Sequence, residues 1–398
     1  MNTSYFNNQN HIQIPHTFVR GMAALLKVLL RVAEKAANVA RVCRQEAPLF
    51  ELLVQEKTGD DKNKKFVQDF KTLADVVIQE MIRHYVGAEF PEMGGFIQGE
   101  ESNKFENGLG ESVVVTVCAS ETETAALLEA VLDGDSTAAA LLAKAIHQDP
   151  AAVDNTLQNT GDLSIPHSPS ELGIWIDPID ATSQYIEGRE MVLEEGHLSP
   201  SGLHCALVLI GVYLRSTGEP IMGVINQPFN YKDPSGRWQG KHFWGVSCEG
   251  VRACSVSLPE SPAEGTGLRA VLSSSEKPAV KKALASLCGP DNVTYASGAG
   301  YKILCVILGL ADLYVLSEGS TFKWDSCAPH ALLRALGGGI VDYTESLGTP
   351  EPRGAQLTYH QPRTQNKGAD CWANQGGLVA YLDCKALGTA IEALNLKP

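Results

Sequence analysis

Segments with a helical hydrophobic period and segments typical of strands alternate along this chain in blocks of mixed order. Amphipathic helices are predicted over Met22–Gln45 and again after Thr72, where Thr72 and Asp75 have the spacing of a capping box. Strand patterns dominate after residue 170, and helical patterns return at Lys277. This order predicts an α/β (mixed α+β) fold in which mixed sheets are covered on both faces by helices.

Composition and charge exclude several classes of protein. The chain has 398 residues, of which 44% are hydrophobic, enough for large packed cores. Its 46 acidic residues outnumber its 32 basic ones, and with a formal net charge of −14 we expect no nucleic-acid partner. Its ten cysteines include no C-x-x-C pair, which argues against a zinc site and against a secreted disulfide scaffold. We therefore expect a reduced, cytoplasmic compartment.

The chain is predicted to divide into three parts. Residues 1–21 are rich in Asn, Gln and His, lack the apolar core of a secretory signal, and are predicted to form a disordered arm. Residues 22–200 are predicted to form an N-terminal α+β subdomain, and residues 201–398 a C-terminal α/β subdomain. The most apolar stretch, Ile303–Leu316, is interrupted by Asp312 and is shorter than the roughly 20 residues of a membrane span. It is predicted to be a buried helix, so we expect no membrane span, and we expect a monomer.

One segment, Gly173-Ile-Trp-Ile-Asp-Pro-Ile-Asp-Ala-Thr182, has residues suited to divalent cations. Asp177 and Asp180 follow a short apolar run, and the Thr182 hydroxyl lies two residues further on. Since Pro178 fixes its own φ and biases the preceding residue towards extended geometry, the two carboxylates are predicted to converge in a stiff turn. Two carboxylates together with waters and a phosphate can form the oxygen shell of Mg²⁺. Alone, the same pattern also fits an ordinary Asx turn.

Further acids stand at the predicted ends of other elements: Asp75, Glu100, Glu101 and Asp325. Each has a structural interpretation beside the functional one. Asp75 and Asp325 can cap the helices that they precede or begin, and the two glutamates can be solvated surface groups. Taken singly, these residues leave the choice between a metal site and a structural role open.

The order of these motifs along the chain is more specific than any one of them. An Asp, a Gly-Glu-Glu, a Trp-x-Asp-Pro-Ile-Asp-x-Thr and a Trp-Asp-x-x-Ala follow one another. In this order they resemble the magnesium-dependent, lithium-sensitive phosphatase superfamily of inositol monophosphatase. The segments that carry the resemblance are Asp69–Val76, Gly223–Pro228, Gly298–Lys302, Ile307–Tyr314, Thr321–Cys327 and Trp372–Leu378. The resemblance covers nearly the whole chain from Met22 onward.

This resemblance implies a layered α-β-α-β-α sandwich and a site that holds two or three Mg²⁺ ions, with Li⁺ as an inhibitor. The implied metal ligands are Glu100, Glu101, Asp177, the carbonyl of Ile179, Asp180 and Asp325. Most of them fall in the predicted N-terminal subdomain, while Asp325 and the substrate contacts fall in the C-terminal one. Asp177 would bridge two ions, which together clamp the phosphate and activate a water.

The resemblance also implies which residues serve catalysis and substrate binding. An Asp and a Thr orient the attacking water in similar enzymes, and Asp75 and Thr182 stand at those positions here, beside the implied ligand Glu100. The Thr182 hydroxyl would donate to Asp75 and accept from the water. The expected substrate contacts are the amides of Ala181 and Thr182, then Ser275 and Lys277, and by resemblance Gly298, Ala299, Lys302 and Glu318. A plain serine N-cap is an equal alternative for the segment that holds Ser275.

The implied reaction is removal of the 1-phosphate from inositol 1,4-bisphosphate and inositol 1,3,4-trisphosphate, both small-molecule inositol polyphosphates. One alternative is a 3'(2'),5'-bisphosphate nucleotidase. An aromatic slot for adenine would favour this alternative, whereas converging lysines would favour an inositol polyphosphate. Another is a non-catalytic scaffold that binds a metal or a phosphoinositide. Every expected metal position carries an oxygen ligand, so nothing in the sequence indicates lost activity.

Overall fold

The computed structural model describes residues 16–45, 54–59, 62–63, 69–107, 109–150, 166–191, 196–258, 267–363 and 365–395. The helices are α1 (His16–Gln45), α3 (Leu73–Glu89), α4 (Glu121–Val131), α5 (Ser136–His147), α6 (Thr182–Glu187), α7 (Pro278–Cys288), α8 (Ala299–Ile307), α9 (Lys323–Ala335), α10 (Tyr343–Leu347) and α11 (Cys384–Asn395). The strands are β1 (Val54–Glu56), β2 (Phe70–Thr72), β3 (Ile97–Gly99), β4 (Lys104–Glu106), β5 (Ser112–Val114), β6 (Leu172–Asp180), β7 (Leu207–Leu214), β8 (Pro220–Lys232), β9 (Trp238–Cys248), β10 (Val251–Cys254), β11 (Ala270–Leu272), β12 (Val293–Tyr295), β13 (Leu313–Leu316), β14 (Gly339–Asp342) and β15 (Leu378–Tyr381).

Two large mixed sheets organise the molecule. The first has six strands in the order β10-β9-β8-β7-β6-β3, and the second has five in the order β12-β11-β13-β15-β14. Parallel pairs join β3 to β6 and β11 to β12 and β13, whereas β6, β7, β8 and β9 pair successively in antiparallel fashion. The predicted mixed sheets are therefore confirmed.

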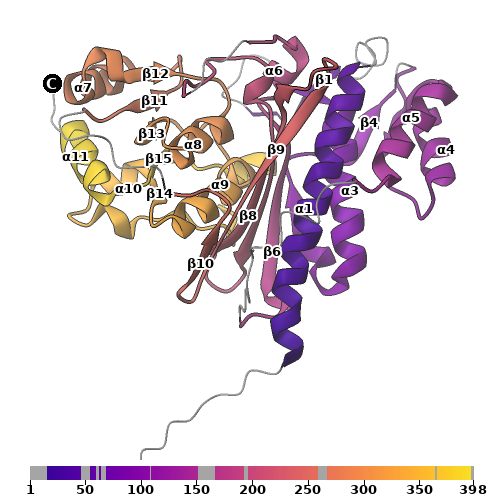
Figure 1. The fold of residues 1–398 in the computed structure, drawn as a ribbon, viewed down its shortest axis with the longest axis horizontal. Helices are drawn as coiled ribbons and strands as arrows, with labels where there is room; N and C mark the ends of the chain where they lie inside the picture. The colour runs from indigo at the N-terminus through magenta and orange to yellow at the C-terminus, as the bar shows by residue number, and fades with distance from the viewer. Residues whose placement is uncertain are drawn as a thin grey trace, which may run out of the picture.

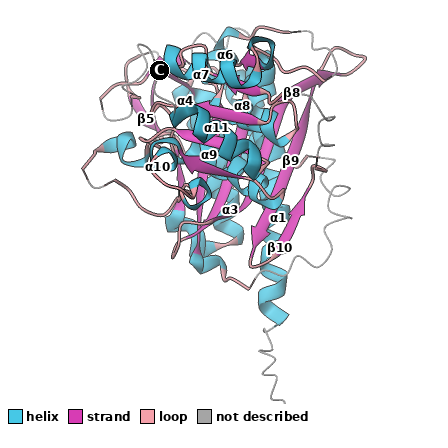
Figure 2. Ribbon diagram, turned by 90° about the vertical axis from the view of Figure 1, so that its left-hand side faces the viewer, coloured by secondary structure: helices cyan, strands magenta, loops and turns pink. Residues whose placement is uncertain are grey.

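Helices cover both faces of each sheet, so the elements stack in five layers (Figure 1). Helices α1 and α3 pack on the outer face of the six-stranded sheet, and α8 and α9 lie between the two sheets. Helices α7 and α11 pack together on the far side of the five-stranded sheet, as the view turned by 90° also shows (Figure 2). This arrangement confirms the predicted layered α-β-α-β-α sandwich.

Alternation along β6 divides its side chains between two hydrophobic cores. Ile174 and Ile176 are fully buried in the core beneath α1 and α3, whereas Trp175 is buried in the core around α8 and α9. Successive side chains of a strand point to opposite faces. Asp177 therefore continues the Trp175 face and points towards the layer of α8 and α9.

A row of glycines brings α9 close to the six-stranded sheet. Gly211, Gly223 and Gly245 are register partners on β7, β8 and β9. A methyl group built on Gly223 would stand 2.2 Å from the carbonyl oxygen of Ala328, and one on Gly245 would stand 2.8 Å from the Cα of Leu332. No side chain fits between the sheet and this helix, so the glycine row fixes where α9 lies.

The N-terminal boundary differs from the prediction. Helix α1 begins at His16, so residues 16–21 of the predicted arm are helical, while residues 1–15 lie outside the described part of the chain. The sequence between His16 and Arg20 contains neither glycine nor proline, and Pro15 is the first residue that breaks the helical pattern. The helix therefore extends six residues further than its apolar periodicity indicated.

The prediction of one buried helix over Ile303–Leu316 is wrong. Helix α8 ends at Ile307, Gly309 adopts a φ of +70°, and β13 begins at Leu313. A glycine in the left-handed region ends a helix, and the remaining apolar run is short enough for a strand buried on both faces. Within the described residues, no helix is both long and apolar enough to cross a membrane.

The predicted subdomain boundary at residue 200 falls between two strands of one sheet. Strand β6 precedes it, β7 follows it, and the two strands pair with each other. The chain passes from the six-stranded to the five-stranded sheet later, between Cys254 and Ala270. The division into residues 22–200 and 201–398 stays a prediction.

Candidate active site

A bulge in β6 places Asp177 and Asp180 on the same side of the sheet. Asp177 pairs with Leu209 and Asp180 pairs with Leu207, so three steps along β6 match two along β7. In a regular strand, residues three apart point to opposite faces, and the extra residue of the bulge reverses that parity. Pro178, which lacks an N–H, lies within this bulge. The predicted stiff turn is thus a bulge within a strand.

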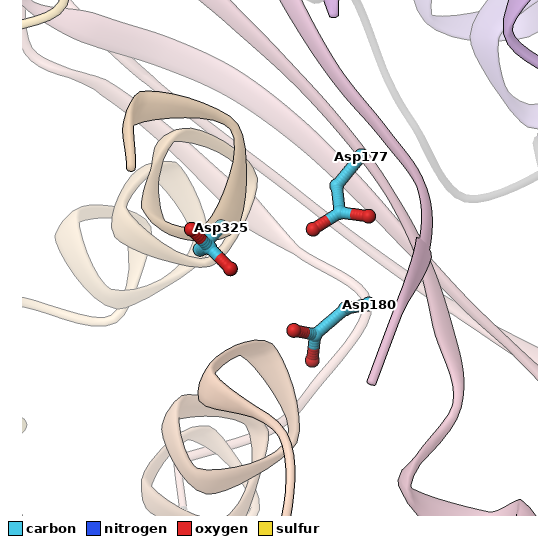
Figure 3. A group of neighbouring side chains, drawn as sticks. All are labelled: Asp177, Asp180 and Asp325. Carbon is cyan, nitrogen blue, oxygen red and sulfur yellow. The ribbon is translucent and has the colours of Figure 1, made fainter. Parts of the chain in front are cut away.

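Asp325 reaches the same place from α9. It is the third residue of that helix, and its Oδ2 accepts a 2.6 Å hydrogen bond from the backbone N–H of Phe322, as in a capping box. Figure 3 shows Asp325 facing Asp177 and Asp180 across the space between helix and strand. Each of the three offers one carboxylate oxygen, and these oxygens lie within 4.8 Å of one another. The helix-cap role and the site role therefore coexist in Asp325.

The three carboxyl groups lie in an environment that disfavours their negative charge. Burial raises the pKa of Asp177 well above its usual value, and the nearby carboxylates of Glu100, Asp180 and Asp325 raise it further. Burial also raises the pKa of Asp325 strongly and that of Asp180 to about 6, in the latter case against the lowering effect of Lys302. The Oδ1 of Asp177 is buried without a hydrogen-bond partner among the described residues. A divalent cation would relieve this repulsion, and the all-oxygen donor set suits Mg²⁺.

Helix α8 supports the position of Asp180. The Oδ2 of Asp180 accepts a 3.3 Å hydrogen bond from the backbone N–H of Tyr301 in the first turn of α8. A methyl group on Gly300 would stand 2.9 Å from that oxygen, and one on Gly298 would stand 3.0 Å from it. The Gly298-Ala-Gly300 turn that the sequence singles out thus lets the helix approach the carboxylate.

Glu100 and Glu101 diverge after the end of β3. Glu100 lines the cavity of the three aspartates, whereas Glu101 lines a neighbouring cavity with Lys104 and Ser112. The ammonium of Lys57 lies 2.6 Å from a carboxylate oxygen of each glutamate. Burial raises the pKa of Glu101 to about 8 despite this cation. The structure therefore groups Glu100, but not Glu101, with the other predicted metal ligands.

The predicted pairing of Asp75 with Thr182 is not what the structure shows. The Thr182 hydroxyl donates to the carbonyl oxygen of Ile179 at 3.0 Å, and the hydroxyl that donates to Asp75 is that of Thr72, at 2.7 Å. The backbone N–H of Thr72 donates to the same Asp75 oxygen at 2.6 Å, which completes the capping box of α3. Both donors belong to Thr72, three residues before Asp75, so the Asp75 carboxylate is engaged in capping the start of its own helix. Burial raises its pKa to about 7.

The cavity above the carboxylates has a volume of about 320 Å³. Of the predicted substrate contacts, Ala181, Thr182, Ser275, Gly298, Ala299 and Lys302 line it, as does the predicted ligand Ile179. Lys277 and Glu318 do not: they form an ion pair of 3.7 Å with each other and are about half exposed. The structure therefore gathers most of the predicted contacts and leaves this pair outside the cavity walls.

Lys302 is turned towards backbone carbonyls. Its ammonium donates to the carbonyl oxygens of Gly298 at 2.6 Å and Ala296 at 3.2 Å, and the side chain is buried. Burial lowers the pKa of Lys302, while Asp180 acts in the opposite direction. The positive charge thus lies beside the carboxylate cluster.

Several cavity residues have no counterpart among the predicted ones. They are Asn63, Asp69, Phe70, Ser273, Ser274, Ser297, Tyr314, Ser320, Thr321, Phe322 and Trp324. Lys57, which contacts Glu100, was missed as well. Burial alone would lower the pKa of Lys57, but Glu100 and Glu101 outweigh it and hold that pKa well above its usual value. The signal in the sequence that could have indicated them is the charged stretch between Lys57-Thr-Gly59 and Asp69.

Comparisons with known proteins agree with this geometry. The model of the inositol monophosphatase family matches residues 25–385. Inositol polyphosphate 1-phosphatase from Homo sapiens is 47% identical, over 95% of this chain and 99% of that protein. The 3'(2'),5'-bisphosphate nucleotidase 1 of Rattus norvegicus is 36% identical, but only over 43% of this chain and 50% of its own length.

A solved structure supports the fold alone. The extragenic suppressor protein suhB from Bartonella henselae covers 94% of this chain and 100% of its own, with a TM-score of 0.51 and 14% identity. The family match spans nearly all the described elements, including those that carry Glu100, Asp177 and Asp325. Carboxylate cluster, fold and sequence lead to the same conclusion: this chain belongs to the inositol monophosphatase family.

Proposed function

We propose that this chain is a Mg²⁺-dependent phosphatase that removes the 1-phosphate of inositol 1,4-bisphosphate and of inositol 1,3,4-trisphosphate. The observation that carries the proposal is the buried cluster of Asp177, Asp180 and Asp325 at the wall of a cavity rich in hydroxyl groups. The human relative that matches along almost its whole length bears the name of that activity, and the family is Mg²⁺-dependent.

In this proposal Asp177, Asp180 and Asp325 hold Mg²⁺, together with Glu100 and the carbonyl of Ile179. The bound ions would polarise the phosphoryl oxygens and lower the pKa of water. The proposal includes two or three ions and inhibition by Li⁺. The unpartnered Oδ1 of Asp177, and the burial and neighbouring carboxylates that raise the pKa of Asp177, support this role.

The chain's own groups would orient the substrate. The amides of Ala181 and Thr182 and the hydroxyl of Ser275 line the cavity and can donate to phosphate oxygens. Ala181 has a φ of +64°, a conformation that a non-glycine residue adopts only where the surroundings impose it. Lys302 would offset the charge of a second phosphate from beside Asp180.

Lys277 and Glu318 would contact the part of the substrate that extends beyond the cavity. Their ion pair is half exposed, so it can open at little cost when a phosphate takes the lysine and a ring hydroxyl takes the glutamate. Glu101 remains a proposed outer ligand. Asp75 is proposed as a residue that positions the attacking water, with Thr72 as its hydroxyl partner.

A second candidate is hydrolysis of 3'-phosphoadenosine 5'-phosphate. The observation that favours it is the aromatic part of the cavity wall, where Phe322 and Trp324 stack with ring centroids 4.5 Å apart and Tyr314 stands nearby in the lining. Both stacked rings are buried to 5% exposure or less, so they offer an adenine little free face. The hydroxyl-lined part of the wall suits a polyhydroxylated ring better.

The deciding experiment is a side-by-side assay of phosphate release from inositol 1,4-bisphosphate and 3'-phosphoadenosine 5'-phosphate. Each is measured with Mg²⁺, after metal removal, and with added Li⁺. Preference for the inositol, lost without metal and inhibited by Li⁺, is the expected result. Preference for the nucleotide would contradict the proposed substrate but not the proposed metal site. If neither compound releases phosphate, a non-catalytic scaffold is the better interpretation.

Three further properties belong to this proposal. We infer a cytoplasmic, monomeric enzyme whose ligand-bearing residues divide between an N-terminal subdomain (22–200) and a C-terminal one (201–398). The net charge of −14 and the scattered cysteines support the location. Sedimentation of the purified chain would test the monomer.

A further inference from the structure

A second cavity, of about 650 Å³, lies at the opposite end of α9 from Asp325. Its walls come from β9, β10, the end of α9, the segment 350–356 that follows α10, and the start of α11. It shares no lining residue with the carboxylate cavity. Arg334, in its wall, is nine residues after Asp325, which is about 14 Å along a helix axis. This arginine-lined cavity is therefore a separate place in the molecule.

Three arginines from three different segments meet at this cavity, in a chain whose net charge is −14. Arg252 comes from β10, Arg334 from the last turn of α9, and Arg353 from the 350–356 segment. Glu351 is the one acid among the lining residues. Guanidinium groups gathered around one space repel one another unless an anion lies between them.

The acids of the protein leave these arginines largely available. Arg334 forms an ion pair with Glu219, yet its Nε is buried and has no hydrogen-bond partner among the described residues. Arg252 and Arg353 form no ion pair with any acid that the structure describes. Both residues are exposed and line the cavity. The Arg353 side chain also interacts with the Tyr381 hydroxyl, so the cavity combines two partly fixed guanidinium groups with that of Arg252, as a built site for an anion would.

Neutral groups around the cavity also favour negative charge. Cys384, Leu387 and Gly388 line it, so the cavity borders one face of α11 near the start of that helix. The Tyr381 hydroxyl accepts a 2.9 Å hydrogen bond from Gln356 Nε2, which leaves its own O–H able to donate elsewhere. Both residues line the cavity.

We propose that the arginine-lined cavity binds a small oxyanion, a metabolite that carries a phosphate or sulfate group, independently of the carboxylate cavity. Arginine suits such a ligand because its planar fork donates two parallel hydrogen bonds to a tetrahedral oxyanion. The volume accommodates a compact metabolite and not only the ion itself. The inference goes beyond the proposed phosphatase activity and does not depend on it.

The test is calorimetric titration of the full chain with inorganic sulfate. The protein is first stripped of divalent metal on a chelating resin, because a free chelator is itself an anion that would compete. In that state Glu100, Asp177, Asp180 and Asp325 repel sulfate from the carboxylate cavity, so saturable one-site binding reports on the arginines. The absence of saturable binding would overturn the proposal, whatever the chain hydrolyses.

Gly388 offers a matched pair of variants. It lies in α11 and lines the cavity, and a Cβ built on it meets no atom within 4 Å. Gly388→Asp adds a carboxylate facing the arginines and should weaken sulfate binding at least about tenfold, whereas Gly388→Ala should bind like the parent chain. Neither change costs helix stability, because glycine is the poorer helix former. Equal affinity in the Asp and Ala variants would contradict the assigned place.

A second pair tests the arginines directly. Arg252→Gln removes an exposed guanidinium of the cavity and should weaken sulfate binding about tenfold. Arg237→Gln, at a distant hairpin where the side chain is 73% exposed and pairs with Asp233, should leave binding unchanged. If both substitutions weaken binding to the same degree, the attraction is a property of overall charge and the proposed site is wrong.

Discussion

Two buried charges in this molecule have opposite surroundings. The ammonium of Lys35, on α1, donates to the carbonyl oxygens of Ile146, His147 and Gln148 at 2.9 to 3.3 Å and pairs with Asp149 at 3.1 Å. The carboxylate of Asp177 has an oxygen with no partner among the described residues, and its charged neighbours are other carboxylates.

The difference separates a structural role from a functional one. Burial lowers the pKa of Lys35 and raises that of Asp177, so in both cases it disfavours the charged form. Lys35 recovers this cost from the unpaired carbonyls at the end of α5, which a cation satisfies. For Asp177, the described residues supply no partner to Oδ1, and the charged groups near it are carboxylates. A buried charge that the fold leaves uncompensated is available for a ligand.

The largest expected effect is on activity. Asp177→Asn removes a proposed metal ligand while keeping the shape of the side chain, so phosphate release should fall by at least about 10³-fold. The thermal unfolding midpoint should stay the same or rise, because one of several repelling carboxylates is gone. The two readouts together distinguish a functional residue from a structural one.

Asp291→Asn is the matched control for that substitution. Asp291 is exposed and lies outside the carboxylate cavity, so its amide variant should retain full activity. If Asp177→Asn keeps its activity, the proposed metal site is wrong, and the contrast with Lys35 is then only one of packing.

Lys35→Met should show the reverse pattern. Methionine has a similar length but no charge, so the carbonyls of His147 and Gln148 lose the Lys35 donor and that of Ile146 keeps only the Tyr85 hydroxyl, and the free energy of unfolding should fall by about 3 kcal/mol. Activity per folded molecule should not change. Chemical denaturation measures the first quantity and phosphate release the second. Lys144→Met, an exposed change on α5, serves as control, and an equal loss in both variants would show that the paired carbonyls contribute nothing.

His330 is a buried titratable group whose partners hold it neutral. Its Nε2 lies 2.9 Å from Gln356 Oε1, which only accepts, so that nitrogen carries the proton and Nδ1 accepts from the Tyr359 hydroxyl at 3.0 Å. Burial and nearby Arg334 lower its pKa from its usual value near 6.5 to about 3. Below pH 6.5 the unfolded chain therefore binds a proton that the folded chain does not.

Stability should accordingly fall as the solution is acidified. Between pH 6.5 and pH 4 this histidine alone should remove about 3 kcal/mol from the free energy of unfolding. In His330→Gln, the free energy of unfolding should fall by about 3 kcal/mol less over the same pH range. Denaturant titrations at several pH values would measure this difference. Parallel curves for the two chains would mean that His330 titrates alike in both states.

Structural predictions from the sequence were confirmed where a local pattern fits only one kind of structure. Local patterns predicted the mixed sheets and the capping box of Thr72 and Asp75, and the family resemblance implied the layered sandwich. The structure also brings three of the predicted acids, Asp177, Asp180 and Asp325, together. The segment Ile303–Leu316 failed because an apolar run fits a buried helix and a buried strand equally well. Gly309 was the signal that separates the two.

The finer geometry of the site depends on partners far apart in the sequence. The sequence indicates that Asp177 and Asp180 converge, but only the register with β7 shows that a bulge achieves it. Likewise, only the placement of the strands and helices shows that the Thr182 hydroxyl donates to the carbonyl oxygen of Ile179 and not to Asp75. Such choices are made by tertiary contacts, which no local pattern encodes.

Mg²⁺ should stabilise the folded chain through the uncompensated carboxylates. A ligand that binds only the folded state at 100 times its dissociation constant adds about 2.7 kcal/mol to the free energy of unfolding. Thermal unfolding of the metal-stripped protein with and without Mg²⁺ would measure the gain. Asp177→Asn should lose most of it and Lys35→Met should keep it, whereas an equal gain in both would place the ion elsewhere.

The smallest expected effect concerns the surroundings of Asp75. This residue combines features of Asp177 and Lys35, because it is a buried acid beside the site yet accepts hydrogen bonds from Thr72. Thr72→Val removes the hydroxyl and keeps the shape, so the capping box loses one of its two reciprocal bonds and unfolding should become easier by about 1 kcal/mol. Thr182→Val removes the hydroxyl that donates to Ile179 and should cost less, within about 0.5 kcal/mol, since that residue is partly exposed. Denaturation of the two variants under one condition compares them directly. A larger loss for Thr182→Val would return Thr182 as the partner of Asp75, and Asp75 would then resemble Asp177 more closely than Lys35.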